Sequence, residues 1–565
     1  RLRVTRCQPV SSAVSSRSSL LVAHHGPWLL LALGCLVVPL VISPVYEVPQ
    51  NDEWAYFQVI ELWFETGEIR HLGWNDPTLL FQIVWGGFFA WILGLSYTAL
   101  RLSTLVLAVV GVFSLYGILR RTGATRGRSA LGAAMLLLNP WFLILGYSFN
   151  TDVSYIGLAL AATLVFLIAI ERENLALYLA GGLLSACAFL VRQPGLLIPV
   201  VFSGYVLVTS RADLRRRFVK VVASLAPVLV AYTLYSDWIR GQTGVSWLES
   251  ASNLHPFFRT PTLAGLDNLF SEACLNAAAG AMTLGALLIP LLFVVVTVRE
   301  RESGSRWISV GLLAGVCVLA AASWFLDARQ FGMVHGWPYQ GNYFTRGGVL
   351  TQYPVLMVGP SWAWNVLTLL VPLLGAGLLA ASGSALRRAW RSLPDGTPGL
   401  VLTVFIVQFL PGFGQIEFYD RYLLVLVPGV AVALTGRAPL PRKVGLAVVA
   451  MTLCFGAISL EYTRAYVDRA QAGWALAEKL VQRGTRPEEI LLGFEWSGSH
   501  LYLDAVRTLD PGYQFDLKHR YPWDSLTDYR YFVAEFDVRP AGPHETYRGF
   551  LSKRRHYIGA LRGPS

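Results

Sequence analysis

The class of fold is decided by stretches such as Val153–Ile170, which reads VSYIGLALAATLVFLIAI and contains no charged side chain. One helical crossing of a bilayer needs about 20 consecutive apolar residues. The chain of 565 residues repeats this pattern, because 54% of its residues are hydrophobic and only 14% are charged. Soluble domains carry about 25% charged residues. The sequence therefore predicts an all-α polytopic membrane protein and excludes a soluble globule, a disordered chain and a disulfide-stapled module.

Apolar runs of about 17 to 23 residues recur along the chain, and we expect about thirteen transmembrane helices. They are Pro27–Tyr46, Ala99–Leu119, Ser129–Tyr147, Val153–Ile170, Leu175–Val191, Pro194–Ser210, Phe218–Tyr235, Asn276–Val298, Trp307–Leu326, Trp362–Ala381, Gly399–Phe413, Tyr422–Gly436 and Val444–Leu460. One further run, Leu79–Leu95, contains Trp85 and Trp91, and we expect it to lie as an interfacial or re-entrant helix on the outer face.

The connections between these runs differ in charge, and this difference predicts the orientation. The basic connections are Arg120–Arg128, Arg211–Lys220, Arg387–Arg391 and Arg437–Lys443, with a mixed loop at Arg299–Arg306. The positive-inside rule places them in the cytosol together with segment 1–26, which holds four arginines and no acid. A rival arrangement makes Leu79–Leu95 a crossing and puts those arginines outside. We interpret the net charge of +11 as cytosolic loop content rather than as a nucleic-acid site.

Charged residues are distributed unevenly along the chain. They number 29 among the 105 residues from Glu461 onward, against 52 in the preceding 460. The last fifth therefore resembles an ordinary soluble domain, and the rest resembles a membrane body. We expect a cytosolic segment 1–26, a transmembrane body 27–460 with its first outer loop at 47–98, and an extracytoplasmic C-terminal domain 461–565.

The C-terminal domain carries no motif that we can assign. Its residue pattern indicates a small α/β unit, with a helix over Arg464–Gln482 and strands over Ile490–Phe494 and Tyr529–Phe536. Two roles are open for this domain: it binds an acceptor, or it only covers a site.

Two adjacent carboxylates, Asp52 and Glu53, lie just beyond the first predicted span, and aromatic residues follow them. A carboxylate held at this boundary could accept a proton from an attacking hydroxyl. A plainer interpretation is also open, because Asn51 or Asp52 is a good N-cap for a helix over Trp54–Glu65.

Three further charged residues are expected at the outer ends of spans. Asp152 could converge with Asp52 or merely cap the next helix. Arg192 precedes Pro194, and Arg421 opens another span. Arginine at an interface commonly reaches toward lipid headgroups, but it is also the side chain best suited to grip a phosphate through paired donors. A lipid phosphate whose tail lies in the bilayer could be held at this depth.

Several common sites are not supported by the sequence. The histidines form no HExxH pattern, the six cysteines form no CxxC pair or disulfide framework, and no Walker A or GxGxxG motif opens a helix. Zinc and nucleotide binding are therefore unsupported. An activated donor on the outer face is expected to be linked to a lipid.

The order of these features resembles the multi-spanning C-type (GT-C) glycosyltransferases, and among them the aminoarabinose transferases of lipid A, the protein O-mannosyltransferases and the transferases that decorate lipopolysaccharide. The resemblance covers about residues 27 to 460. It rests on the Asp52-Glu53 pair after one span, on Ala99–Ser103 leading into the next, on Ala188–Pro194, which is similar to an LxxRxP stretch, and on Arg421–Leu424 with Pro428, which is similar to an RYLLP stretch. The chain departs from the family at 75–78, where Lys-Pro-Pro or His-Pro-Pro is frequent.

The resemblance implies transfer of a sugar, with inversion, from a polyprenyl phosphate donor to a hydroxyl acceptor on the outer face of the cytoplasmic membrane. Asp52 would act as general base, and Glu53 and Asp152 would orient the acceptor or assist charge placement. Arg421 and Arg192 would hold the leaving phosphate. The acceptor would be an envelope glycan, lipid or protein. Some family members use a divalent metal ion, which three acids would permit without requiring it.

Two other classes of protein remain open. A secondary transporter or lipid-linked-sugar flippase usually has ionisable or Gly/Pro-broken segments near the membrane midplane, often in two related halves. Here the spans are nearly free of mid-span charge, and the acids and arginines lie at their outer ends. This pattern favours catalysis at the interface over passage through the bilayer, and over a non-catalytic envelope protein.

Overall fold

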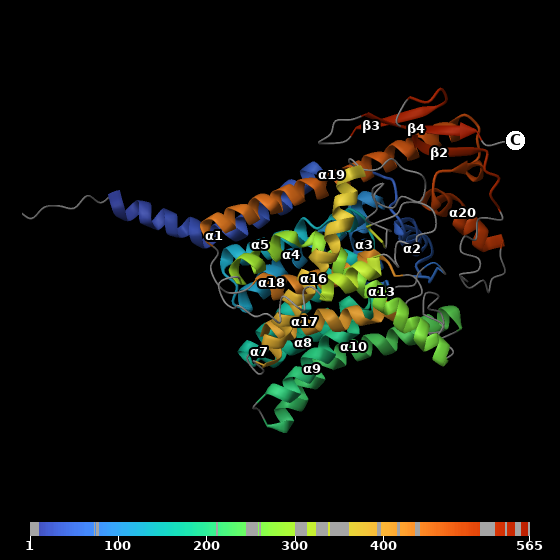
Figure 1. Ribbon diagram of the computed structural model, residues 1–565. Coiled ribbons are helices and arrows are strands. Elements are labelled where there is room, and N and C mark those ends of the chain that lie inside the picture. Colours follow the sequence, from blue (N-terminus) through green and yellow to red (C-terminus); the bar gives the residue numbers. More distant parts are fainter. Residues whose placement is uncertain are drawn as a thin grey trace, which may run out of the picture.

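The computed structural model describes residues 11–72, 74, 78–210, 213–244, 258, 261–299, 314–323, 337–339, 361–391, 397–414, 418–435, 441–508, 526–536, 539–548 and 555–562. These residues form a bundle of helices with a small sheet at the C-terminal end (Figure 1). The expected all-α polytopic fold with a small C-terminal α/β unit is confirmed. The membrane body contains α1 (Ser11–Val41), α4 (Tyr97–Arg121), α5 (Arg126–Leu137), α6 (Pro140–Gly146), α7 (Thr151–Arg172), α8 (Leu175–Phe189), α9 (Leu197–Thr209), α10 (Leu214–Thr243), α13 (Leu263–Leu287), α14 (Ile289–Arg299), α16 (Ser361–Arg391), α17 (Thr397–Phe409) and α18 (Leu426–Thr435).

Within the described part of the chain, six helices are long and apolar enough to cross a membrane, or up to eight if each of two bent pairs is one span. Five shorter apolar helices accompany them. The exact number of crossings, about thirteen from the sequence, therefore stays a prediction. Of the expected span Trp307–Leu326, only 314–323 lies within the described residues.

The expected span Ser129–Tyr147 is not one straight helix. It is divided into α5 and α6, which meet at a bend of 59°. Pro140 begins α6, where its missing N–H costs nothing, and the Asn139 Oδ1 atom accepts hydrogen bonds from Trp141 N and Phe142 N. The Asn-Pro pair is a local signal that overrides the hydropathy of the run.

Helices α4 and α7 pack closely because glycine occupies their contact. A Cβ atom on Gly157 would lie 2.3 Å from the backbone oxygen of Leu107, and a Cβ atom on Gly111 would lie 3.1 Å from the Gly157 Cα. Small residues let helix backbones approach one another, which is how helices associate in a bilayer. Helix α7 is thereby enclosed, and its N-terminal end is fixed relative to α4.

Two helices separate α1 from α4, namely α2 (Glu53–Thr66) and α3 (Leu80–Leu93). Helix α3 has 14 residues, and its length of about 21 Å is shorter than a bilayer core of about 30 Å. Its placement at the interface, expected for Leu79–Leu95, stays a prediction.

The C-terminal part is built on α19 (Arg442–Gln482), a 41-residue helix that runs through the expected domain boundary at 461 and extends from the bundle to the sheet (Figure 1). It is followed by η4 (Pro487–Glu489), β1 (Ile490–Leu491), α20 (Phe494–Thr508), β2 (Tyr531–Phe536), β3 (His544–Arg548) and β4 (Arg555–Arg562). The strand order is β1-β2-β4-β3, with β1 and β2 parallel and the other pairs antiparallel. Leu476, Leu480, Trp496 and Ile558 belong to its core.

The strand expected over Ile490–Phe494 is shorter than predicted. It ends at Leu491, because Gly493 takes a φ of 154° and Phe494 begins α20. The expected helix Arg464–Gln482 is the second half of α19, and the expected strand Tyr529–Phe536 corresponds to β2.

Candidate active site

Four elements bring charged side chains together at one end of the bundle. Asp52 stands at the N-cap position of α2, and Asp152 lies in the first turn of α7. Arg192 precedes the short helix η1 (Gln193–Leu196), and Arg421 lies in η3 (Asp420–Val425). Each is at the end of a helix, where the chain turns, so the four can meet without burying charge in the middle of a span.

An ion pair joins two of these residues. The Nη1 atom of Arg192 contacts the Oδ1 atom of Asp152, whose side chain is only 6% exposed. The Arg192 guanidinium carbon lies 5.4 Å from the centre of the Tyr422 ring. Arginine is weakly hydrated and stacks on aromatic faces, which suits it to this enclosed position.

The other arginine faces the other carboxylate. The Nη2 atom of Arg421 lies 3.8 Å from the Oδ2 atom of Asp52, a loose ion pair. Its guanidinium carbon is 5.9 Å from the ring centre of Tyr422, the ring that Arg192 also faces. The two arginines named from the sequence, each paired with one of the two acids also named from it, therefore face the same tyrosine ring.

A residue that sequence reasoning did not single out lies among them. The Tyr56 side chain is buried, with 4% of the residue exposed. Burial raises the pKa of the Tyr56 hydroxyl well above its usual range; the charges of Asp52 and Asp152 act in the same direction, and those of Arg421 and Arg192 oppose them. All four charges thus act on this one hydroxyl. The feature of the sequence that could have identified Tyr56 is its spacing, since it follows Asp52 by about one helical turn.

Both oxygens of the Asp52 carboxylate accept hydrogen bonds from neighbouring side chains. Trp74 Nε1 donates to Oδ1 at 2.9 Å, and Asn51 Nδ2 donates to Oδ2 at 2.8 Å. Although Asp52 occupies the N-cap position, its side chain accepts no capping hydrogen bond from α2. The carboxylate is therefore directed toward the charged cluster instead of the helix backbone.

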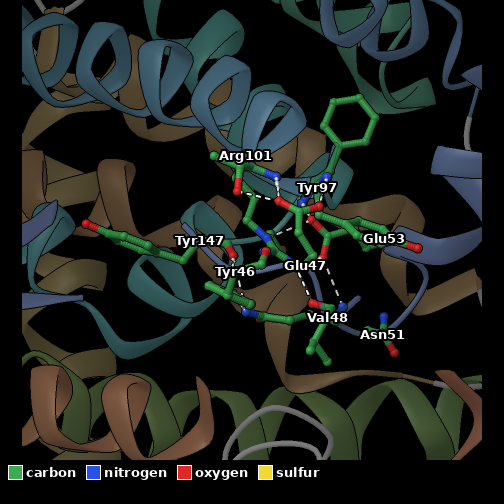
Figure 2. Close-up of polar contacts among 12 residues, drawn as sticks. Tyr46, Glu47, Val48, Asn51, Glu53, Tyr97, Arg101 and Tyr147 are labelled. Atoms are coloured by element: carbon green, nitrogen blue, oxygen red, sulfur yellow. Dashed lines mark hydrogen bonds and ion pairs between the residues drawn. The ribbon is translucent and has the colours of Figure 1, made fainter. Parts of the chain in front are cut away.

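Glu53 has a different environment from its neighbour, as Figure 2 shows. Its side chain and that of Arg101 are both fully buried, with Arg101 Nη2 2.6 Å from Glu53 Oε2 and Arg101 Nε 3.0 Å from Glu53 Oε1. The backbone N–H groups of Gln50 and Phe149 each donate to the same carboxylate at 2.9 Å. Four donors thus occupy Glu53, two on each oxygen. Its expected part in orienting the acceptor or assisting charge placement stays a prediction.

The guanidinium of Arg101 is equally occupied. It donates to the carbonyl oxygens of Tyr46 and Val48 and lies over the Tyr46 ring at 3.6 Å (Figure 2). The sequence signal was a lone arginine inside an apolar run, which needs an anionic partner. The Glu53–Arg101 pair ties the start of α2 to α4 and, through Phe149, to the segment that carries Asp152.

A metal ion does not fit the acids that the structure describes. Among the described residues, no group of three or more His, Cys, Asp or Glu side chains is arranged to hold one. Asp52 and Asp152 each face an arginine instead. The departure from the family pattern at Asn75, Asp76 and Pro77 lies outside the described residues.

Part of the chain matches a known family. Residues 78–236 match the family model described as dolichyl-phosphate-mannose-protein mannosyltransferase. No curated protein sequence matches the chain. The matched segment runs from the start of α3 into α10 and contains Asp152 and Arg192.

Three solved structures are similar at low identity. Archaeal oligosaccharyltransferase AglB from Archaeoglobus fulgidus, in complex with an inhibitory peptide and a dolichol-phosphate, is 14% identical with a TM-score of 0.43 over 88% of this chain and 61% of that chain. ArnT from Cupriavidus metallidurans bound to undecaprenyl phosphate is 17% identical with a TM-score of 0.40 over 96% and 100%. The S. cerevisiae Pmt1-Pmt2 complex bound to the sugar donor is 16% identical with a TM-score of 0.30 over 42% and 37%.

The chain thus spans 61% of the length of the AglB chain. The segment that holds Asp152 and Arg192 matches the dolichyl-phosphate-mannose-protein mannosyltransferase family, and the resemblance inferred from the short motifs is confirmed.

Proposed function

We propose that the chain is an integral-membrane glycosyltransferase that moves a sugar from a polyprenyl phosphate donor to a hydroxyl acceptor. The observation that carries the proposal is the convergence of Asp52 and Asp152 with Arg192 and Arg421 at one end of an apolar helix bundle. A base and a phosphate clamp beside a lipid-accessible surface are the two parts that such a transfer requires. The family match over residues 78–236 supports the same class of reaction.

Asp52 is the proposed general base. Its carboxylate takes the proton of the acceptor hydroxyl while that oxygen forms a bond to the anomeric carbon of the donor. The bond from the anomeric carbon to the phosphate oxygen breaks on the opposite face, so the configuration inverts and the lipid phosphate leaves with the electron pair. Trp74 and Asn51 fix the carboxylate for this attack, since each donates to one of its oxygens.

Arg421 and Arg192 are the proposed partners of the leaving phosphate. A guanidinium carries a permanent charge and offers paired donors that match phosphate oxygens. The two guanidinium groups face the same Tyr422 ring, so one phosphate can be held between them. Asp152 acts on the reaction through Arg192, whose orientation it fixes. Glu53 has a positioning role in the same sense, through Arg101.

The proposed orientation of the chain in the membrane is based on the distribution of basic residues. The basic connections are placed in the cytosol with segment 1–26, so the charged cluster and the domain from 461 lie on the outer face of the cytoplasmic membrane. The donor is a polyprenyl phosphate sugar, because a lipid carries its activated group to a face without nucleotides. An envelope glycan, lipid or protein is the acceptor class.

The test uses the full chain in lipid nanodiscs. Undecaprenyl phosphate and dolichyl phosphate esters of several monosaccharides are supplied with an envelope extract, and released polyprenyl phosphate is measured by mass spectrometry. We expect release with at least one donor, dependent on the extract and lost in Asp52→Asn. A wild-type chain that moves intact lipid-linked sugars across a vesicle membrane without cleaving them would support the transporter instead.

A further inference from the structure

The C-terminal domain contacts the start of α2 through α20. The Trp54 ring of α2 lies 5.1 Å from the ring of Tyr502, and a Cβ atom on Gly498 would lie 2.3 Å from Trp54. Gln58 Nε2 donates to the carbonyl oxygen of Gly498 at 3.3 Å. Leu501 and Tyr502 belong to the same buried cluster as Trp54. The close approach at Gly498 makes this a fitted contact between the domain and α2.

The two groups that hold Asp52 both touch α20. Trp74, which donates to one Asp52 oxygen, stacks on Phe494 with ring centres 6.3 Å apart and an interplanar angle of 16°. Asn51, which donates to the other oxygen, donates its backbone N–H to Glu495 Oε1 at 3.3 Å. Phe494 and Glu495 are the first two residues of α20. Each oxygen of the proposed base is thus linked through one intermediate residue to the C-terminal domain.

The conformation of Asn51 makes the second link specific. Its φ is 52°, in the left-handed region that asparagine tolerates better than most residues. In this conformation its backbone N–H meets Glu495 while its side-chain amide meets Asp52. A change at Glu495 therefore reaches the Asp52 carboxylate through this one residue.

We propose that the C-terminal domain completes the active site, with Glu495 as a positioning residue that acts on Asp52 through Asn51. The inference rests on the proposed function, in which Asp52 is the base. It assigns the domain a part in the chemistry itself, since Phe494 and Glu495 hold the two groups that orient the base. It also predicts that separating α20 from α2 would remove the contacts that hold Asn51 and Trp74 in place beside Asp52.

The charge of Glu495 gives the link a second consequence. Burial raises the pKa of Glu495 to about 7, the charge of Asp52 adds to this, and Arg469 of α19 together with the hydrogen bond from Asn51 opposes it. Arg421 faces Asp52 from the other direction. Like charges repel, so a negative Glu495 favours the step in which the negative charge of Asp52 is neutralised by the acceptor proton. Transfer should therefore rise with pH as Glu495 ionises near neutrality.

The first experiment needs no substrate. Carbodiimide reacts with protonated carboxyl groups, so peptide mass spectrometry of the full chain in nanodiscs, labelled from about pH 5 to 9, reports the ionisation of Glu495. We expect its labelling to fall with a midpoint near pH 7, and to fall at a pH lower by about half a unit or more in Asp52→Asn. The exposed Glu478 on α19 is the reference carboxylate. An identical Glu495 midpoint in both proteins would overturn the proposal.

The second experiment uses a donor that the wild type turns over. Between about pH 6 and 8 the wild-type rate should rise roughly threefold to tenfold, and Glu495→Gln should remove this rise while leaving the KM for the donor within about twofold. Glu495→Asp should restore part of it, and Glu478→Gln should behave as wild type. Equal melting temperatures show that the variants fold.

The outcomes of the two experiments separate the two proposals. A wild-type pH profile that persists in Glu495→Gln would refute the role of Glu495 and leave the proposed function intact. If the wild type cleaves no donor, the proposed function fails, and the labelling midpoints alone decide whether Glu495 and Asp52 are coupled.

Discussion

The carboxylate of Glu53 lies 2.6 Å from the Nη2 atom of Arg101, and neither side chain is exposed to solvent. This pair joins the start of α2 to α4. Glu53 adjoins the proposed base, Asp52, in the sequence, yet it takes no direct part in the proposed reaction. The Glu53–Arg101 pair instead fixes the position of the start of α2 and, through Phe149, of the segment that carries Asp152.

Removing one member of this pair should destabilise the protein strongly. Glu53→Gln or Arg101→Met each leaves a buried group without its counter-charge, and we expect a loss of about 3 to 5 kcal/mol. The double variant should lose less than the sum of the single variants, because no lone charge remains. Thermal unfolding in detergent measures the effect. Single variants that melt like the wild type would contradict this account.

Asp52→Asn should lower the rate of sugar transfer by about a hundredfold to ten-thousandfold, because the amide cannot accept the proton. Binding of undecaprenyl phosphate should change little by comparison. Asp468→Asn is the control, since Asp468 is held by Arg464 on α19. Transfer at the wild-type rate by Asp52→Asn would remove Asp52 from the role of base.

Arg421→Ala should weaken the binding of undecaprenyl phosphate by about tenfold to a hundredfold, and Arg421→Lys should recover part of it because the charge returns without the paired donors. Native mass spectrometry or a tritiated lipid measures the affinity. Arg464→Ala, which removes a half-buried arginine of α19, should leave the affinity unchanged. Equal affinity in Arg421→Ala and wild type would place the phosphate elsewhere.

Gly157→Val should destabilise the bundle by at least about 3 kcal/mol, the upper end of the usual cost of overpacking. The valine side chain has to displace the backbone of Leu107 rather than a flexible side chain. Gly204→Ala on α9 is the matched control, since a Cβ atom there meets nothing within 4 Å. Alanine favours a helix over glycine by about 1 kcal/mol, so this control should be neutral or stabilising. Melting temperatures that do not differ would contradict the described α4–α7 contact.

Gly498→Ala should loosen the contact between the C-terminal domain and α2, because the added methyl group overlaps the Trp54 ring. We expect faster proteolysis within the domain and a lower transfer rate, while the membrane body stays folded. Gly542→Ala in the same domain meets its nearest atom at an ordinary 3.4 Å and serves as control. A Gly498→Ala protein with wild-type proteolysis and transfer would show that the contact is dispensable.

Hydropathy was sufficient to predict the class of fold, because a helix in a bilayer must be apolar along its whole length. It was not sufficient for the breaks, since a local Asn139–Pro140 signal divides one apolar run into two helices. The long-range contacts were also hidden. Arg101 is 48 residues from Glu53, and nothing in the local sequence selects one partner over another.

The two acids at the start of α2 show why adjacency misleads. Consecutive residues on a helix project about 100° apart, so neighbours in sequence do not face the same site. Asp52 is directed toward Arg421, whereas Glu53 is directed toward Arg101. Spacing of four residues would have been the better guide, since it pairs Asp52 with Tyr56. Glu495 had no sequence signal, because its proximity to Asn51 depends on how the whole C-terminal domain packs.

Helix α19 has 41 residues and no proline, and it passes from the bundle into the C-terminal core without interruption. At about 1.5 Å per residue it is roughly 60 Å long. The bundle and the C-terminal core are therefore joined by one continuous, stiff helix rather than by a flexible linker. A change in the tilt of α19 would therefore also move the C-terminal core that packs on its second half.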